Sequence, residues 1–400
     1  MKIKVGVLYG GKTTEHEVSI ITAVQAMGYL NEEKYEVIPM YLTKENEMYT
    51  GEPLKDMDVY KDFDLLKRYC TNVTCYGKDG VLKLQRKNGL FKRVINDIDI
   101  VLLAVHGYNV EDGNLQGMLE TFGVPYTGSD IYGCTVGQDK VFQKQILKSE
   151  GIPVSDYTWF YDNEFLEDSE SILKNIKKLG YPVIVKPSRQ GSSIGIEVAK
   201  DEESVIKAIN EAIKYDDKIL VEKIVPNMVE LNCSVLGSTN YMETSVIEQV
   251  MGKDEILSFN DKYIGSGSKK SVAKKITPSK GMASADRIIP ADIPKKLKEE
   301  IEDTSKKTFR ALGASGVVRI DYLYDKKAKK YYVNELNSIP GSLSFYLWTP
   351  KNKEYDALLD DMINIAIKRY KKKNKKTTIF ESNILASFNG SKGVKGIKRR

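Results

Sequence analysis

The segment GVVRIDYLYDKKAKKYYVNELN, residues 316–337, constrains the fold more than any other stretch of the chain. It contains two apolar strand patterns joined by a lysine-rich turn, and this arrangement predicts an antiparallel hairpin. The simplest register pairs Asp321 with Glu335 and Arg319 with Asn337. Because residues two apart in a strand share a face, we expect all four side chains on one side of the sheet.

The polar face of this hairpin has two interpretations. An exposed ladder of charged residues would show the same pattern, but the flanking residues are apolar and favour an interior sheet. They are Val317, Val318, Ile320, Leu323 and Val333. Two carboxylates and a carboxamide inside a sheet need a cation to balance them. Because Asp321, Glu335 and Asn337 offer only oxygen ligands, the pattern favours Mg²⁺, which fills its other positions with phosphate oxygens and water.

The N-terminal part of the chain alternates apolar strand patterns with helical ones. The strand patterns are KIKVGVLYGG and DIDIVLLAVHG, and the helical patterns are EVSIITAVQAMGYL and NLQGMLETFG. This alternation predicts an α/β domain with a parallel sheet over residues 1–139, whose functional residues lie at the C-terminal ends of the strands. Glu15, His106 and the EDG sequence at 111–113 fall at those ends.

A dinucleotide-binding domain shares this alternation and is the obvious alternative. Its fingerprint is G-x-G-x-x-G directly after the first strand. The corresponding stretch here is VLYGGKTTE, which lacks that spacing, so the sequence gives no positive reason to propose nicotinamide binding.

The middle of the chain carries a second chemical signal. The stretch YPVIVKPSRQGSSIGIEVAK predicts two strands joined by a polar glycine loop, with Lys186 at the end of the first strand. Backbone N–H groups and hydroxyls of such a loop can converge on a phosphate, although a flexible hairpin tip has the same composition. The next strand, ILVEK, delivers Glu222 and Lys223, and Glu230 begins another. These residues predict a nucleotide site in which a carboxylate binds ribose hydroxyls.

Basic residues are concentrated at the C-terminal end. Residues 368–400 carry twelve Lys or Arg and one Glu, a local charge of +11; the whole chain carries +6, so the remainder carries −5. Such a run could attract nucleic acid or an anionic membrane, but it is more often solvated and flexible. We therefore expect neither partner.

The composition is that of an ordinary globular protein, with 41% apolar and 29% charged residues. No apolar run approaches the length of a membrane span, and the N-terminus has no signal-sequence pattern. The four cysteines form no CxxC pair and no zinc spacing, which favours reduced thiols. These features predict a cytoplasmic protein.

Taken together, the motifs resemble one family. GGKTTEHEVSI, HGYNVEDGNLQGMLETFGVPYTGSD, QDKVFQK, VIVKPSRQGSSIG, LVEK, VRID and NELNSIPG occur in the order seen in D-alanine–D-alanine ligases of the ATP-grasp superfamily. ATP-grasp enzymes clamp ATP between two α+β domains and phosphorylate a carboxylate, and an amine then attacks the acyl phosphate. The resemblance implies a ligase that joins two D-alanines for peptidoglycan precursors. It also implies central and C-terminal ATP-grasp subdomains at 140–229 and 230–370, and a homodimer. The basic tail at 371–400, which we expect to be flexible, has no counterpart in a typical member.

The resemblance also implies roles for the nucleotide and metal candidates. Contacts to ATP fall to Lys140, Lys186, Ser193, Glu222, Lys223, Glu230 and Lys262. Two Mg²⁺ ions, for which Mn²⁺ could substitute, would be bound by Asp321, Glu335 and Asn337.

The amino-acid site follows from the same resemblance. Glu15 would hold the ammonium group of the first amino acid, although an acidic helix start is also an ordinary feature. Ser192 would link Glu15 to a lid tyrosine. Arg319 and the backbone N–H of Gly341 would stabilise the charge that builds on the attacked carbonyl oxygen. His106 would lie near the amino acid, as a positioned hydrogen-bonding group and not as the base.

The stretch ILSFNDKYIGSGSKK resembles the lid of these enzymes, with Lys262 and Tyr263 at its Lys-Tyr pair. A mobile segment of this composition can order over ATP and exclude water from an acyl phosphate. Relatives that form an ester with a hydroxy acid tend to lack this tyrosine, so Tyr263 indicates an amine nucleophile.

One departure from the family pattern concerns the second substrate. Many members have a serine followed by a leucine after the Pro-Gly turn, and these bind the carboxylate of the second D-alanine. Here Tyr346 and Leu347 occupy those positions, within an aromatic run that could equally be core packing. Two alternatives therefore stay open: a ligase with a different second amino acid such as D-serine, and a nucleotide-binding protein without ligase activity.

Overall fold

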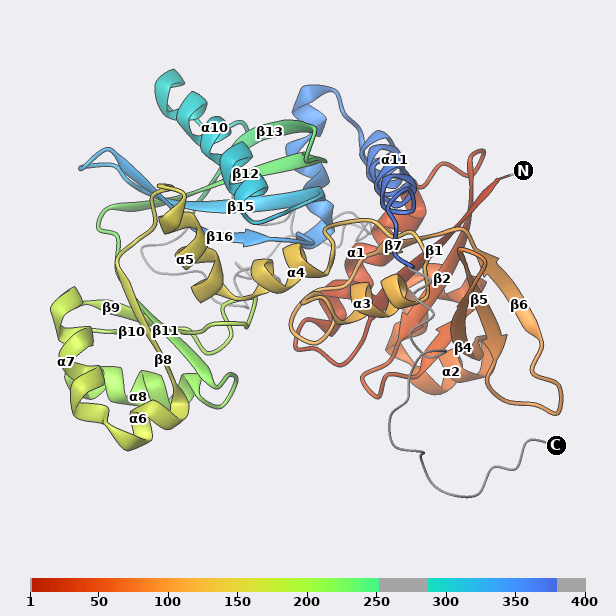
Figure 1. Ribbon diagram of the computed structural model, residues 1–400, viewed down its shortest axis with the longest axis horizontal. Coiled ribbons are helices and arrows are strands. Elements are labelled where there is room, and N and C mark those ends of the chain that lie inside the picture. The colour runs from red at the N-terminus through yellow and green to blue at the C-terminus, as the bar shows by residue number, and fades with distance from the viewer. Residues whose placement is uncertain (1, 252–286, 380–400) are drawn as a thin grey trace, which may run out of the picture.

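The computed structural model describes residues 2–251 and 287–379. The predicted lid residues Lys262 and Tyr263 lie outside the described residues, as does most of the predicted tail. Three sheets form three lobes (Figure 1). The first sheet lies at the right of the view, and the second and third lie at the left, with the third above the second.

The first sheet has seven strands in the order β6-β5-β4-β3-β2-β1-β7. They are β1 (Ile3–Gly10), β2 (Tyr35–Leu42), β3 (Met48–Thr50), β4 (Thr71–Lys78), β5 (Val81–Arg86), β6 (Val94–Ile98) and β7 (Ile100–Leu103). Its helices are α1 (His16–Tyr29), α2 (Phe63–Tyr69) and α3 (Asn114–Thr121). Strand β1 pairs in parallel with β2 and β7, which confirms the predicted α/β class and places Glu15 and His106 just beyond strand ends.

The sheet is less uniform than the prediction of a parallel sheet implied. From β2 to β6 every pair of neighbouring strands is antiparallel, so the parallel part is confined to three strands. Asp79 and Gly80 form the two-residue turn between β4 and β5, and both have positive φ angles. An Asp-Gly pair of this kind is a strong hairpin signal, because both central residues of the turn need a left-handed backbone.

The second sheet is small and antiparallel, in the order β10-β9-β11-β8. Its strands are β8 (Tyr157–Tyr161), β9 (Val183–Pro187), β10 (Glu197–Ala199) and β11 (Lys218–Lys223). Three helices pack on it: α6 (Asp162–Glu167), α7 (Ser169–Leu179) and α8 (Glu202–Ala212). Strands β9 and β10 pair on either side of the polar glycine loop, which confirms the predicted hairpin.

The third sheet contains the hairpin that was predicted from residues 316–337. Its order is β14-β13-β12-β15-β16, with β12 (Met228–Ser238), β13 (Tyr241–Val250), β14 (Arg287–Ile288), β15 (Gly316–Asp325) and β16 (Lys330–Asn337). Helix α10 (Lys295–Ala311) covers one face. The predicted register is confirmed, since Asp321 pairs with Glu335 and Arg319 with Asn337, and it shifts by one residue after Asp321. Strand β15 is interior, whereas β16 forms the edge.

Three further helices connect the lobes. Helices α4 (Ile131–Gln138) and α5 (Lys140–Ser149) follow the first sheet, and Leu147 of α5 packs into the core of the third sheet. Helix α11 (Tyr355–Lys373) packs back onto the core of the first sheet. The described chain thus crosses between lobes repeatedly, and the predicted boundaries at 139/140, 229/230 and 370/371 stay a prediction.

The aromatic run after the Pro-Gly turn packs mainly into the core. It lies in the short 3₁₀ segments Gly341–Leu347 and Thr349–Lys351. The Phe345 ring stacks on Tyr355 with 4.5 Å between ring centroids. Trp348 is fully buried, and its indole Nε1 donates a hydrogen bond to Ser234 Oγ at 3.2 Å. Core packing therefore accounts for most of this run.

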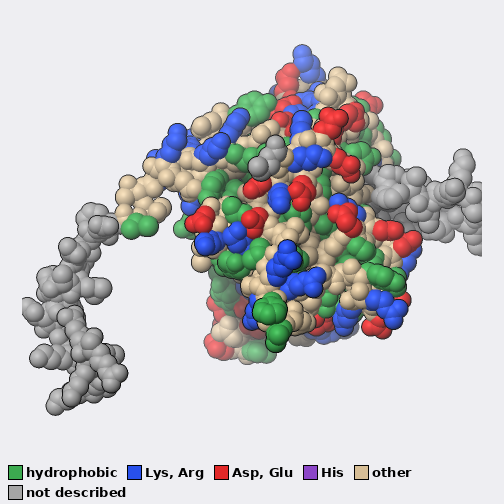
Figure 2. Space-filling view, turned by 90° about the vertical axis from the view of Figure 1, so that its right-hand side faces the viewer, with side chains coloured by type: hydrophobic (Ala, Val, Ile, Leu, Met, Phe, Trp, Pro, Cys, Tyr) green, Lys and Arg blue, Asp and Glu red, His purple; other side chains and the backbone are tan. Residues whose placement is uncertain are grey.

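On the face shown in Figure 2, basic and acidic side chains are interspersed. Within residues 2–251 and 287–379, no helix is both long enough and apolar enough to span a bilayer.

Candidate active site

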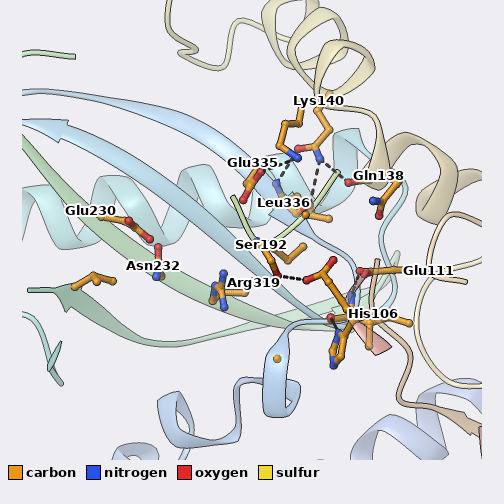
Figure 3. A pocket seen from close by; sticks show the side chains of 18 of the residues that line it. His106, Glu111, Gln138, Lys140, Ser192, Glu230, Asn232, Arg319, Glu335 and Leu336 are labelled. Carbon is orange, nitrogen blue, oxygen red and sulfur yellow. Dashed lines mark hydrogen bonds and ion pairs between the residues drawn. The ribbon is translucent and has the colours of Figure 1, made fainter. Parts of the chain in front are cut away.

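One pocket collects residues from all three lobes (Figure 3). Nine of the residues assigned from the sequence line it: Glu15, His106, Lys140, Ser192, Glu230, Arg319, Glu335, Asn337 and Gly341. They come from the strand ends of the first sheet, the glycine loop, the start of α5 and one face of the third sheet. The fold therefore brings together most of a site that the sequence scatters over more than 300 residues.

The glycine loop meets the start of α1. Ser192 Oγ donates a hydrogen bond to Glu15 Oε1, and the Glu15 side chain is buried. A Cβ atom on Gly191 would lie 2.3 Å from Glu15 Oε2, and one on Gly107 would lie 2.8 Å from the same oxygen. A side chain at either position would meet the Glu15 carboxylate, so glycine lets this carboxylate approach the backbone closely. Ser192 and Ser193 have positive φ angles, so the loop is held in a strained conformation.

On the third sheet, Arg319 and Asp321 form a bidentate ion pair. The Nε–Oδ1 and Nη2–Oδ2 distances are both 2.6 Å, and Asn337 Nδ2 donates to Asp321 Oδ2 at 3.0 Å. Burial by itself would lower the pKa of Arg319, but Asp321 raises it well above its ordinary value. Arg319 is therefore a fixed positive charge at the pocket wall.

Lys140, the first residue of α5, faces the edge strand of the same sheet. Its Nζ lies 3.2 Å from Glu335 Oε2 and donates to the Gln190 carbonyl at 2.7 Å. Burial would lower the pKa of Lys140, but the Glu335 carboxylate raises it. The pair therefore places the Lys140 cation beside Glu335, one of the three metal candidates.

A second charged group lies deeper, between the second and third sheets. Glu222 accepts from Lys144 Nζ at 2.5 Å, from Lys186 Nζ at 2.6 Å and from Ser155 Oγ at 2.6 Å. Lys186 Nζ also donates to Asn334 Oδ1 at 3.2 Å. Burial would raise the pKa of Glu222, but the two lysines lower it below its ordinary value. Glu222 is therefore a buried anion that holds two lysines in place.

The remaining nucleotide candidates are more exposed. Glu230 lies near Asn232 on β12 at the pocket wall (Figure 3). Ser193 is half-buried in the loop, and the side chain of Lys223 is exposed at the end of β11. Neither Ser193 nor Lys223 lines the pocket in the part of the chain that the structure describes.

His106 is buried, and both of its ring nitrogens have partners. Nδ1 lies 2.8 Å from the Ile339 carbonyl, and Nε2 lies 2.8 Å from Thr22 Oγ1. The carbonyl can only accept, so Nδ1 carries the proton and Nε2 accepts from the threonine hydroxyl. Burial lowers the pKa of His106 to about 4. A neutral imidazole with both nitrogens engaged is suited to positioning and not to proton transfer.

The predicted second-substrate residues adjoin an arginine that the sequence did not reveal. Arg287 Nη1 lies 2.7 Å from Glu248 Oε2 and donates to the Tyr346 phenol oxygen at 2.6 Å, and its guanidinium lies over the Tyr346 ring. Burial raises the pKa of Tyr346 to about 12. The side chain of Leu347 points into the core, which leaves only its backbone for a ligand. Arg287 lines the pocket, so a cationic group stands at this end of the site.

Four further residues contribute to the site although no role was assigned to them from the sequence. They are Glu111, Lys144, Asn232 and Arg287. A signal was present for three of them, since Glu111 belongs to the EDG sequence, Lys144 ends the QDKVFQK motif, and Asn232 lies two residues after Glu230 on the same face of β12. Arg287 had no signal, because only the pairing of β14 with β13 brings it to the site.

The fold and the pocket define a class of protein, the ATP-grasp ligases. Two family models match the chain: "D-ala D-ala ligase N-terminus" over residues 4–129 and "D-ala D-ala ligase C-terminus" over residues 146–364. The chain belongs to the D-alanine–D-alanine ligase family.

Individual relatives agree with this membership over nearly the full length. A D-alanine–D-alanine ligase from Thermosipho melanesiensis is 39% identical over 385 residues, covering 96% of this chain and 98% of the relative. One from Natranaerobius thermophilus is 35% identical over 385 residues, covering 95% and 99%.

Solved structures show the same fold. The D-alanine–D-alanine ligase from Coxiella burnetii has a TM-score of 0.76 at 25% identity, covering 94% of this chain and 96% of that structure. VanG D-Ala:D-Ser ligase from Enterococcus faecalis has a TM-score of 0.75 at 25% identity, covering 92% and 100%.

Proposed function

We propose that this ligase joins two D-alanines at the expense of ATP to give D-alanyl-D-alanine for peptidoglycan precursors. The observation that supports this proposal best is that one pocket collects groups for each part of the reaction. Lys140 pairs with Glu335, Arg319 and Gly341 line the pocket wall, and Glu15 contacts the glycine loop. Such a set suits a reaction in which a carboxylate is first phosphorylated and then attacked by an amine.

In the first step, a carboxylate oxygen of the first D-alanine bonds to the γ-phosphorus of ATP, and ADP leaves. Lys140 and Lys186 bind the phosphate oxygens and are held ready by Glu335 and Glu222. Glu15 fixes the ammonium group of the substrate. Such positioning converts a bimolecular reaction into an effectively unimolecular one.

In the second step, the amine nitrogen of the second D-alanine bonds to the carbonyl carbon of the acyl phosphate. Phosphate then leaves with the electron pair of the C–O bond, and the nitrogen loses its extra proton. Negative charge collects on the carbonyl oxygen, where Arg319 and the Gly341 N–H are placed to receive it. Donors aimed at developing charge are usually the largest single contribution to catalysis.

The donor set of the third sheet fits Mg²⁺. Asp321 and Glu335 are paired across the hairpin, and Asn337 adds a carboxamide on the same face, so every ligand is a hard oxygen. These three residues would hold the metal, two ions in all with Mn²⁺ as a substitute, and the metal would neutralise phosphate charge. The chain itself contributes the lysines and Arg319, which bind the substrates directly.

Tyr346 supplies a prediction about the second amino acid. We propose that its phenol, oriented by Arg287, replaces the usual serine in binding the second carboxylate. Tyr346→Phe should raise the KM for the second D-alanine by about tenfold, since about 1.4 kcal/mol for one hydrogen bond corresponds to that factor. The KM for ATP should not change, and Tyr241→Phe, which alters an exposed tyrosine, serves as the control. An unchanged second KM would remove Tyr346 from the substrate site.

The proposed function is tested by ADP release from purified protein with ATP, Mg²⁺ and a panel of D-amino acids. D-alanine alone should stimulate release and yield the dipeptide. Stimulation only by mixed pairs such as D-alanine with D-serine would keep the chemistry and change the second substrate. Release that no amino acid stimulates would favour a nucleotide-binding protein without ligase activity.

Three further expectations belong to this proposal. The protein is expected in the cytoplasm, where ATP and free amino acids are available. It is expected to form a homodimer and to bind no nucleic acid. Light scattering of the purified chain measures its mass in solution and so tests the homodimer directly.

A further inference from the structure

The peptide segment that carries Gly341 is anchored by a different lobe. Residues 338–340 connect β16 to the 3₁₀ segment Gly341–Leu347, and polar groups of residues 338–342 bond to the first lobe. Ser342 N donates to Thr22 Oγ1 at 3.0 Å, and Ser342 Oγ donates to Gln25 Oε1 at 2.7 Å. The donors and acceptors that fix this segment therefore come from residues more than 200 positions earlier in the chain.

Glu111 stands at the centre of these contacts. Its Oε1 accepts from the Ile339 backbone N–H at 2.8 Å and from Ser338 Oγ at 2.8 Å. Its Oε2 accepts from the Gly107 N–H at 3.0 Å. The carboxylate thus ties the end of β16 to the turn that follows β7, and it lines the same pocket as Arg319 and Gly341.

The bonding pattern requires a group that accepts on both oxygens. All three partners of the Glu111 side chain are donors, one of them on Oε2 and two on Oε1. An ionised carboxylate satisfies them all, whereas a carboxamide would direct its NH₂ group at one donor. Beside it, His106 donates from Nδ1 to the Ile339 carbonyl, so the backbone N–H and the carbonyl of Ile339 are both held by the first lobe.

We infer that Glu111 is a positioning residue whose carboxylate sets the direction of the Gly341 N–H through the Ser338–Ile339 backbone. This inference rests on the proposed function for the role of Gly341, but the anchoring itself does not. Through this anchor, the first lobe would help to stabilise the attacked carbonyl oxygen, in addition to binding the first amino acid. Gly341 lies two residues after Ile339. A displacement of the Ile339 backbone would therefore also move the N–H of Gly341.

The surroundings make this anchor sensitive to pH. Burial raises the pKa of Glu111 to about 7, and Glu15 adds to the rise, whereas the three hydrogen bonds lower it. The other titratable groups that face it are His106, which is neutral, and the buried thiol of Cys134. Protonation would give one of the two carboxylate oxygens an O–H group, which would then face a hydrogen-bond donor. The anchored form is therefore the carboxylate, which predominates above about pH 7.

The test compares Glu111→Gln with the wild type and with Glu120→Gln as control, a glutamate of helix α3 in an ion pair with Lys373. Glu111→Gln should lower kcat by about 10- to 100-fold, a range typical of a misaligned donor, with the KM for ATP changed less than threefold. The kcat of the wild type should rise with pH through an apparent pKa near 7, and the kcat of Glu111→Gln should not show this rise. The kcat of Glu120→Gln should stay within twofold of the wild type.

Hydrogen exchange separates this inference from the proposed function. The peptide covering residues 338–342 should exchange faster in Glu111→Gln than in the wild type at one pH, whether or not the chain makes a dipeptide. If Glu111→Gln does not fold, Ser338→Ala removes one bond of the anchor from the other side and should reproduce part of both effects. Unchanged exchange together with a kcat within twofold of the wild type would overturn the inference. Faster exchange in Glu111→Gln, together with a wild type that shows no D-alanine-dependent turnover, would retain the anchor and reject the proposed function.

Discussion

Glu335→Gln is expected to lower kcat by about three orders of magnitude, because about 4 kcal/mol of transition-state stabilisation corresponds to that factor. The substitution keeps the shape of the side chain and removes one of two carboxylates proposed to hold Mg²⁺. It also removes the charge that holds Lys140 at 3.2 Å, so the phosphates lose two contacts at once. Steady-state ADP release at saturating ATP and Mg²⁺ measures the effect.

The fold should survive this change, since Glu335 lies on an edge strand at the pocket wall. Circular dichroism checks that point. Glu302→Gln is the matched control, because it removes a glutamate from an ion pair with Lys298 on the outer helix α10. A kcat within tenfold of the wild type for Glu335→Gln would contradict the metal assignment.

Glu222→Gln should produce the largest loss of stability among the charged positions. The variant leaves Lys144 and Lys186 buried without their common anion. Breaking a buried ion pair by removing one partner typically costs about 3–5 kcal/mol, because the remaining charge is left uncompensated. Urea unfolding should therefore show a clear fall in midpoint, whereas Glu203→Gln, in an exposed pair with Lys207, should leave the midpoint unchanged.

The pH dependence of this loss has a defined sign. The pKa of Glu222 is lower in the folded protein than its ordinary value of 4.5. Folding therefore favours the carboxylate, and its contribution is complete above that value and declines as the pH falls below it. The stability difference between wild type and Glu222→Gln should shrink below about pH 4.5. A difference that is equally large at pH 3 and pH 7 would contradict the ion-pair account.

The hairpin of the third sheet could be predicted from sequence because its information is local. A period of two and a short turn determine which residues face each other, and the structure reproduces the pairs Asp321–Glu335 and Arg319–Asn337. The glycine loop and the strand ends of the first sheet were local signals of the same kind. The aromatic run was more ambiguous, because core packing and ligand binding select the same side chains.

Other parts could not be read from the sequence, because they depend on packing between distant segments. Lys144 looks like one more polar residue on a helix until the fold places it against Glu222. Glu111 lay in a recognised motif, but its partners Ser338 and Ile339 are 227 and 228 residues away. Arg287 reaches the pocket because β14 pairs with β13. The antiparallel part of the first sheet is different, since the Asp79–Gly80 turn was a local signal that went unused.

Phosphorylation of the D-alanine carboxylate can be followed with D-alanine labelled with ¹⁸O in its carboxylate and mass spectrometry of the inorganic phosphate released. Each phosphate formed together with the dipeptide should carry one ¹⁸O atom, because the bridging oxygen of the acyl phosphate leaves with phosphorus. Phosphate that contains no label while the dipeptide accumulates would rule out an acyl phosphate as the intermediate.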